Sequence, residues 1–470
     1  MSTSGVGSTE PPQGGGAGFA GAGATTVLRG ATVIETIDPV SVLDGDVRID
    51  DGRVTAVGGH VAMPASVCDC TGCLVVPGNV NGHTHLYSAL ARGMPYALAP
   101  PENFVQILER IWWRLDRALD EDGVRASALT GAMEALLSGT TTLVDHHASP
   151  NAIDGSLDVI AEALGSLGIR SVLCYETSDR DGPERAQAGL AENRRFLEAV
   201  RRDGPPLARG LVGAHASFTL SDRTLAALVE LTRKLGAGLH IHVAEDAADE
   251  RDSVDRYGLR VAERLARAGA LDEHALLAHG VHLDDAEISL VREANATVAH
   301  NARSNMNNSI GRARVALVGS RVALGTDGIG GDMFEEARAA YFRLREDGGG
   351  AGAEWPLERL AEGARLAGRV FGEPLLGTLE PGAPADLVVL DYAAPAPVDE
   401  RSFPGHWVFG LSARAVRDVM VAGEWVVQDR RLVRADEGEL AELARAEAAR
   451  LWRRLEETDV HELEGEGAPR

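Results

Sequence analysis

The sequence predicts an α/β protein in which a (β/α)8 TIM-like barrel is inserted in a small β-sandwich formed from the N- and C-terminal segments. Between residues 77 and 379, short apolar runs alternate with stretches of helical character, which is the pattern of such a barrel. At both ends of the chain lie segments rich in Val and Ile with turn signals between them. A length of 470 residues is enough for one large domain and one smaller domain.

The terminal segments are expected to surround the barrel in sequence. Residues 1–25 are rich in Gly, Ser and Pro and carry too little apolar surface to fold, which predicts a disordered tail. Residues 26–76 contain short Val- and Ile-rich runs separated by Asp-Gly turn dipeptides, the pattern of β-hairpins. The same pattern returns over 380–435, and the two pieces most simply form one sandwich. Residues 436–470 are expected to form a helix and an acidic tail.

The segment 77–379 is expected to hold the barrel, and its start falls within the first strand candidate, 74–80. In a barrel of this kind the catalytic groups lie where the strands end and the following loops begin. Each strand candidate should therefore be followed by polar, reactive side chains. The candidates are 74–80, 140–145, 170–175, 208–215, 237–245, 275–281, 296–302 and 321–327.

Composition excludes several classes of partner. The net charge is −24, from 46 basic and 70 acidic residues, which argues against nucleic acid or an anionic membrane. Neither a signal peptide nor an apolar run near the roughly 20 residues of a membrane span is present, so we expect a cytoplasmic protein. We interpret the cysteines as reduced, because a chain of this size does not need disulfides. They are Cys68, Cys70, Cys73 and Cys174.

A His-Thr-His sequence follows the first strand candidate. His83 and His85 are two residues apart, so in an extended strand both imidazoles point to the same side. Neutral imidazole is a common ligand of zinc and iron, but a single His-x-His pair is a weak signal. The other strand ends strengthen it, because nine of the 14 histidines fall at or beside them. The remaining polar groups at these ends include His146, His147, His215, His242, Glu245, His279, His300 and Asp327.

These motifs carry a resemblance to a known family. The order HTH, H-x-x-E, H and TDG resembles the amidohydrolase superfamily, specifically its mononuclear aminohydrolase branch of deaminases and chlorohydrolases. Five longer strings are most similar to the SsnA-type aminohydrolases, and the resemblance extends over about 26–454. The strings are IWWRLDRALDED (111–122), VDHHASP (144–150), GLHIHVAED (238–246), HNARSNMNNSIG (300–311) and LGTDGIGGDMFEEAR (324–338).

The resemblance implies one divalent metal ion, Zn²⁺ or alternatively Fe²⁺, and a set of catalytic roles. Three imidazoles and one carboxylate would leave a position for water, which is typical of a catalytic site. Asp327 would take the proton of that water, and Glu245 would protonate a ring nitrogen of the substrate. His279 would orient the water or stabilise the developing oxyanion. The implied ligands are His83, His85, His242 and Asp327.

The resemblance also implies a small heterocyclic substrate and a homo-oligomer. His215 matches a substrate-contacting histidine, and Arg303 could bind an anionic or carbonyl-rich group in bidentate fashion. His240 is interpreted as a core residue or as one that supports the ligands from behind, because only His242 has the H-x-x-E spacing. Trp112 and Trp113 favour helix packing over a substrate lid. The further residues expected to shape the substrate pocket are His146, His147, His300 and Asn305.

The expected reaction is deamination by a metal-activated water, and three alternatives stay open. Hydrolytic ring opening usually needs a carboxylated lysine after strand 4, but Lys234 lies in a helical stretch; Glu176 could still serve a second metal. Hydrolytic dechlorination uses the same chemistry and generally lacks the H-x-x-E glutamate. A non-catalytic scaffold would typically have lost ligands, and this chain keeps them.

Overall fold

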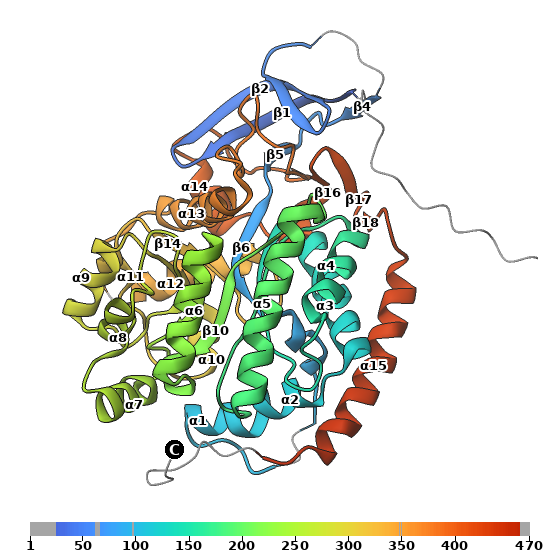
Figure 1. Cartoon of the computed structure of the whole chain (residues 1–470). Helices are drawn as coiled ribbons and strands as arrows, with labels where there is room; N and C mark the ends of the chain where they lie inside the picture. Colours follow the sequence, from blue (N-terminus) through green and yellow to red (C-terminus); the bar gives the residue numbers. More distant parts are fainter. Residues whose placement is uncertain (1–24, 62–65, 96–97, 347, 349, 461–470) are drawn as a thin grey trace, which may run out of the picture.

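The computed structural model describes residues 25–61, 66–95, 98–346, 348 and 350–460. Strands from both ends of the chain lie together at one end of the molecule, next to a body of alternating strands and helices (Figure 1). The tail expected over 1–25 lies outside the described residues except for Thr25, and so does the acidic end 461–470. In the described part, no helix has the length and apolar character that crossing a membrane requires.

The terminal strands form a single sheet. Among the described residues it has nine strands, in the order β18-β17-β16-β15-β5-β1-β2-β3, with β4 also paired to β1. The Asp51–Gly52 dipeptide joins β2 to β3 with φ values of 48° and 77°, as a tight hairpin turn requires. The two chain ends meet where β5 pairs antiparallel with β15. The prediction of two facing sheets is not confirmed. The strands are β1 (Thr25–Ile37), β2 (Val40–Asp50), β3 (Arg53–Val57), β4 (Ser66–Asp69), β5 (Leu74–Pro77), β15 (Leu387–Leu390), β16 (Val416–Val421), β17 (Glu424–Gln428) and β18 (Arg431–Leu432).

The body has the alternating strands and helices of a TIM barrel, so the predicted fold is confirmed in its coarse form. Its parallel strands divide between two sheets, β6-β7-β8-β9 and β10-β11-β12-β13-β14, and do not form one closed ring of ladders in the described residues. Isolated bridges join the sheets at two seams, Thr84 with Asp327 and Thr177 with Ala214. The strands are β6 (Asn79–Thr84), β7 (Thr140–His147), β8 (Arg170–Tyr175), β9 (Ala208–Gly210), β10 (Val212–Ala216), β11 (Leu239–Val243), β12 (Leu276–His279), β13 (Thr297–His300) and β14 (Val322–Leu324).

Two of the predicted barrel strands are each divided in the structure. The run 74–80 contains β5, which belongs to the terminal sheet, and the start of β6, the first barrel strand. Gly78 separates them, and a Cβ there would lie 2.2 Å from Oγ1 of Thr141. The run 208–215 is likewise split at Leu211 between β9 and β10, which pair in different sheets. A glycine lies at or beside each break, Gly78 and Gly210, but only the tertiary partners show that the two pieces belong to different sheets.

Helices between the strands cover the outside of the barrel (Figure 1). Local signals set their ends: the Ser221 hydroxyl caps α6 by accepting from the amide of Thr224, and Gly236 ends α6 in the left-handed region. The helices are α3 (Glu121–Leu137), α4 (Ser156–Leu167), α5 (Pro183–Asp203), α6 (Asp222–Leu235), α7 (Ala247–Tyr257), α8 (Val261–Ala268), α9 (Asp285–Glu293), α10 (Ala302–Asn307), α11 (Val315–Val318), α12 (Met333–Glu346), α13 (Glu354–Phe371) and α14 (Phe403–Phe409).

The C-terminal helix α15 (Glu437–Glu457) runs along one side of the barrel, against α3 and α2 (Trp113–Ala118) (Figure 1). Arg450 donates to Oδ1 of Asp120, the residue that caps α3, over 2.7 Å. Arg114 of α2 donates to the carbonyl of Leu455 over 2.5 Å. These contacts fix the helical segment that precedes α3, and that segment forms part of the site described below.

A buried ion pair links the barrel to the terminal sheet. Arg170 at the start of β8 donates from Nε and Nη2 to the two carboxylate oxygens of Asp386, over 2.8 and 3.0 Å. Asp386 also accepts from the amide of Ala422 over 2.7 Å. Arg170 opens its strand, so the terminal sheet lies at the amino ends of the barrel strands. The opposite, carboxyl ends are free to form a site.

Candidate active site

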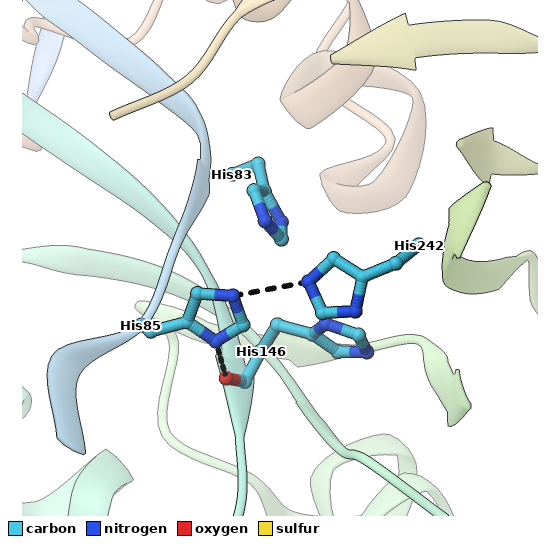
Figure 2. A group of neighbouring side chains, drawn as sticks. All are labelled: His83, His85, His146 and His242. Carbon is cyan, nitrogen blue, oxygen red and sulfur yellow. Dashed lines mark hydrogen bonds between the residues drawn. The ribbon is translucent and has the colours of Figure 1, made fainter. Parts of the chain in front are cut away.

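Four side chains that the sequence analysis singled out meet at the carboxyl ends of the barrel strands. His83 lies on β6 and His85 directly follows it, His242 lies on β11, and Asp327 follows β14. Nε2 of His85 is 3.1 Å from Nε2 of His242 and 3.1 Å from Oδ1 of Asp327. Nε2 of His83 is 3.8 Å from the same carboxylate oxygen. Figure 2 shows the three imidazole rings turned toward one another.

The donor atoms of this cluster fit a divalent metal ion. Two ligand nitrogens around a tetrahedral Zn²⁺ lie about 3.3 Å apart for Zn–N bonds of about 2.0 Å, close to the spacing of His85 and His242. Nε2 of His83 is buried and has no hydrogen-bond partner among the described residues. Such an atom is costly unless something binds it. One ring nitrogen from each of the three histidines and from neighbouring His146 lies within 4.8 Å of the others.

Main-chain carbonyls orient two of these rings. Nδ1 of His85 donates to the carbonyl of His146 over 2.6 Å, and Nδ1 of His242 donates to the carbonyl of His215 over 2.8 Å. A carbonyl oxygen only accepts, so both rings carry a proton on Nδ1 and present Nε2 to the cluster. Burial lowers the pKa of His242 to about 4, which keeps this ring neutral and able to act as a ligand.

Glu245 and His279 lie beside the cluster. Nε2 of His279 is 3.5 Å from Oε2 of Glu245 and 3.7 Å from Oδ2 of Asp327. Burial, and then the charge of Asp327, raise the pKa of Glu245 well above its ordinary value. Burial also acts to raise the pKa of Asp327, but the close contact with His85 and the nearby imidazoles hold it well below its usual range. The surroundings therefore favour the protonated form of Glu245 and the ionised form of Asp327.

The backbone turns sharply at three of the strand ends that form the site. Ala244, His279 and Asp327 have φ values of 47°, 75° and 56°, in the left-handed region that non-glycine residues rarely adopt. Ala244 lies between His242 and Glu245. Backbone strain of this kind is found where the surrounding structure forces a side chain into a functional position. The three turns place the imidazole and the carboxyl groups on one side.

A cavity of about 320 Å³ opens onto the cluster. His242, Glu245 and Asp327 contribute to its wall, and Trp112 and Trp113 lie on another side. The interpretation of the two tryptophans as helix packing is incomplete, because both line the cavity while Trp113 also contacts His215 and Phe218. Apolar and aromatic walls with a few polar groups are typical of small-molecule sites. The other apolar and aromatic lining residues are Tyr87, Phe104, Leu108 and Ile329.

The aromatic wall comes from one irregular helical segment. It consists of α1 (Phe104–Ile107), a single π-helical stretch η2 (Leu108–Trp112), and α2. A π-turn inside a helix is uncommon and often marks a functional site. The wider turn presents Phe104, Leu108 and Trp112, spaced four residues apart, to the same cavity. The two short 3₁₀ turns η1 (Leu86–Ala91) and η3 (Ser217–Thr219) follow directly after β6 and β10.

Only some of the other residues predicted to bind substrate lie at the cavity or contact the catalytic residues. His215 lines the cavity, and Asn305 accepts a hydrogen bond from Nδ1 of His279 over 2.8 Å. The ring of His146 is stacked on that of His240, below the cluster. His147 pairs with Ser149 over 2.8 Å. None of His146, His147 and His300 belongs to the described lining of this cavity.

Arg303 is occupied by partners of its own chain. Nε lies 2.6 Å from Glu336, Nη1 lies 3.0 Å from Glu335, and Nη2 donates to the carbonyl of Gly330 over 2.7 Å. Its side chain lines a neighbouring cavity of about 400 Å³ that shares Asp327 with the first. A role for Arg303 in substrate binding stays a prediction, and these contacts assign it a structural task.

Several residues at the site escaped the sequence analysis. The hydroxyl of Ser304 donates to Oδ2 of Asp327 over 2.5 Å, although its neighbours Arg303 and Asn305 were both singled out. Oε1 of Glu176, considered only as a ligand of a second metal, lies 3.1 Å from Nδ1 of His85. Arg180 and Asp116 form a buried ion pair in the cavity wall. Ser304 could have been found from the motif around it, but no local pattern indicates the ion pair.

Fold and site together define a class of protein: a hydrolase that uses a metal centre at the carboxyl ends of TIM-barrel strands. The model of the Amidohydrolase family matches residues 74–426. The chain belongs to this family. It is a hydrolase that acts on carbon–nitrogen bonds other than peptide bonds, as the resemblance of its motifs implied.

Curated relatives cover almost the whole chain. A 5'-deoxyadenosine deaminase of Methanosarcina mazei is 31% identical over 442 residues, which are 92% of this chain and 99% of the relative. A 5-methylthioadenosine/S-adenosylhomocysteine deaminase of Nitratidesulfovibrio vulgaris is 34% identical over 428 residues, which are 87% and 94% of the two chains. Both names describe removal of an amino group, so the relatives support the deaminase branch that the motifs predicted.

Solved structures agree with the fold. An adenosine deaminase from Xanthomonas campestris with bound zinc superposes with a TM-score of 0.80 at 25% identity, covering 91% of this chain and 98% of that one. Atrazine chlorohydrolase from Arthrobacter aurescens, in complex with zinc, gives a TM-score of 0.76 at 23% identity, with coverages of 90% and 100%. The second likeness is evidence for the fold alone. The zinc-bound adenosine deaminase and the histidine cluster together support a divalent metal in this chain.

Proposed function

We propose that the protein deaminates a small nitrogen heterocycle, with one divalent metal ion, most simply Zn²⁺, held by His83, His85, His242 and Asp327. The observation that carries this proposal is geometric: four ligand groups from three strand ends converge beside Glu245 and His279 at one cavity. The deaminase names of the relatives support the same reaction. The SsnA-type subgroup and the homo-oligomer stay predictions.

The side chains divide the proton transfers between them. A divalent ion at this position supplies a Lewis acid that makes water a nucleophile near neutral pH. Asp327, ionised, accepts the proton of the attacking water. Nδ1 of His279 donates to Asn305, so Nε2 keeps a lone pair that holds and orients the water. Glu245, protonated, gives its proton to a ring nitrogen of the substrate and so lets the attacked carbon accept oxygen.

The cavity favours a flat and uncharged substrate. Trp112, Trp113 and Tyr87 offer aromatic surfaces against which a heterocycle can pack. Glu176 and Asp327 also line the wall, whereas the charges of Arg180 and Asp116 offset each other in an ion pair. A phosphate or carboxylate on the substrate would meet this negative charge at close range. We therefore favour neutral aminated purines, pyrimidines or pterins, including nucleosides such as 5'-deoxyadenosine.

A substrate screen tests the proposal. Ammonia release is measured from a panel of aminated heterocycles, with zinc-loaded and iron-loaded protein side by side. Glu245→Gln is the matched control, because the change keeps the size of the side chain but removes its acid. We expect this variant to keep its metal and to lose about 10²–10⁴-fold in kcat.

The product decides between the reactions. Free ammonia with an intact ring supports deamination, whereas an opened ring identifies the alternative hydrolysis of a cyclic C–N bond. Release of chloride from a chlorinated heterocycle, without ammonia from any aminated one, would overturn the proposal. A Glu245→Gln variant with unchanged kcat would remove Glu245 as the proton donor. Metal content after each loading distinguishes zinc from iron as the active ion.

A further inference from the structure

The three histidines of the proposed metal centre are oriented in two different ways. His85 and His242 each donate from Nδ1 to a main-chain carbonyl of a neighbouring strand end. His83 instead has its Nδ1 2.9 Å from Nε2 of another histidine, His240. A ring nitrogen can donate or accept, so this contact alone does not fix which nitrogen of His83 carries the proton. The next contacts in the same direction do.

His240 is the second member of a buried series that crosses the barrel interior. Its Nδ1 lies 3.4 Å from Sγ of Cys174 on β8. The thiol in turn donates to the main-chain carbonyl of Asp145 on β7, with 3.6 Å between sulfur and oxygen. His83, Cys174 and His240 have no exposed surface, so water does not reach the series.

The two contacts of the thiol give the series its direction. The thiol has one proton, and the carbonyl of Asp145 can only accept; both contacts are hydrogen bonds when the thiol donates to this carbonyl and its sulfur accepts from Nδ1–H of His240. With its proton on Nδ1, His240 has a lone pair on Nε2, which accepts from Nδ1–H of His83. His83 is left with a lone pair on Nε2. That atom faces Oδ1 of Asp327 at 3.8 Å.

We propose that Cys174 and His240 are positioning residues that select the tautomer of His83 in which Nε2 can bind the metal ion. The inference rests on the proposed function, because it assigns a task toward the same metal centre. The ring of His146 supports it by stacking on His240, with centroids 4.2 Å apart and an angle of 17° between the planes. Burial raises the pKa of the Cys174 thiol, so the thiol keeps the proton that it donates.

The series gives a physical reason for two residues that the sequence left without a task. His240 supports the ligand His83 from behind, and Cys174 completes the hydrogen-bonded series through its thiol. Partners of this kind, behind the ligands of a metal, set the orientation and basicity of the ligating ring, and their loss typically weakens metal binding about 10–100-fold.

The first experiment is a direct measurement of the tautomer. Histidine-selective ¹⁵N NMR on the metal-free wild-type protein distinguishes a proton on Nδ1 of His83 from one on Nε2. We expect Nδ1–H in His83 and in His240. A proton on Nε2 of His83 would overturn the proposal without any variant, and this readout does not depend on turnover or on bound metal.

The second experiment compares zinc dissociation constants, measured by competition with a chelator. Cys174→Ala breaks the series and should weaken zinc binding by about tenfold or more, with mixed tautomers of His83. Cys174→Ser keeps a group that donates and accepts, so it should stay within a few-fold of the wild type. Cys70→Ala is the matched control, because Cys70 is equally buried but packs in the terminal sheet.

His240 offers a second pair of variants. His240→Gln retains one acceptor and one donor, whereas His240→Leu retains neither, so zinc binding should weaken more in His240→Leu. Equal zinc affinity and an unchanged His83 tautomer in Cys174→Ala and His240→Leu would refute the positioning role while the metal centre stands. A wild-type protein that binds no divalent metal, with the expected tautomer in NMR, would refute the metal centre instead.

Discussion

The buried ion pair at the amino end of the barrel and the histidine cluster at its carboxyl end differ in how many of their polar atoms have hydrogen-bond partners. At the amino ends of the strands, Arg170 and Asp386 are joined by two hydrogen bonds, and Asp386 accepts a third from Ala422. At the carboxyl ends, several buried atoms have no hydrogen-bond partner within the described ranges. They include Nε2 of His83, Oδ2 of Asp145 and Nε2 of His279.

This difference indicates that the residues important for stability and those important for function lie at opposite ends of the barrel. A buried polar atom without a partner costs roughly 1–3 kcal/mol, so a cluster of them is retained only where a ligand or a reaction uses them. A buried ion pair with all its bonds made holds parts of the chain together without offering anything to a ligand. In barrels of this type the carboxyl ends carry the chemistry and the amino ends carry stability. Each end can be tested separately.

The largest effect is expected from Asp327→Ala at the carboxyl end. The variant loses both a ligand and the base that accepts the proton of water, so turnover and metal retention should disappear together. Metal content and kcat/KM are measured on the same preparation. The free energy of unfolding of the metal-free variant should fall less than in the Asp386 variant described below, because groups at a functional site contribute little to stability.

Two results would contradict this expectation. A fully active Asp327→Ala would show that the ligand assignment is wrong. Loss of activity with a full equivalent of metal retained would leave Asp327 as a base only. Removing the metal from the wild-type protein with a chelator provides the matching control. Activity should disappear and return when zinc is added. The thermal midpoint should also rise when zinc is added, because only the folded state binds the metal.

The sequence predicts the carboxyl end of the barrel better than the amino end. His83, His85, His242 and Asp327 could be found because each follows a short apolar run, and the fold brings such strand ends to one mouth. The assignment of β5 and β6 to different sheets could not, because Pro77-Gly78 can signal a break but does not show that β5 pairs with β15.

Within the site, contacts between residues far apart in the sequence also limit what the sequence can predict. Arg303 in a polar loop suggests a ligand-binding residue, but no local pattern predicts its contact with Glu336 of α12, 33 positions away. The bond between His240 and Cys174 joins residues 66 positions apart. No helical or strand period connects such residues, so their roles follow only from the packed structure.

The next effect is expected at the amino end, from Asp386→Ala. The change leaves the guanidinium of Arg170 buried without its carboxylate, and breaking such a pair typically costs about 3–5 kcal/mol. The free energy of unfolding from denaturant titrations should fall by that amount. The kcat of the folded protein should stay close to the wild type, because the pair lies at the end opposite the cavity. Replacing both partners, Arg170→Met with Asp386→Leu, should cost clearly less.

An equal loss in the single and the double variant would show that the pair acts through packing alone. A large fall in kcat for Asp386→Ala, measured where the variant is fully folded, would mean that the two ends are coupled. Either result would blur the separation described above.

The smallest effect is a pH dependence that belongs to the carboxyl end. Burial lowers the pKa of His300, at the end of β13, to about 4, from about 6.5 in the unfolded chain. As the pH falls below 6.5, His300 becomes protonated in the unfolded chain but stays neutral in the folded chain. The free energy of unfolding should therefore decrease between pH 6.5 and 4, by about 3 kcal/mol for this histidine, and not further below pH 4.

The contribution of His300 is isolated by comparison. Denaturant titrations at several pH values between 7 and 4 are made on the wild type, on His300→Leu and on His274→Gln, whose side chain is 59% exposed. The curve of His300→Leu should be flatter than that of the wild type, and the curve of His274→Gln should follow the wild type. Identical slopes for His300→Leu and the wild type would mean that acid weakens the protein elsewhere. A flatter curve would place part of its acid sensitivity in the same histidine-rich end that carries the proposed chemistry.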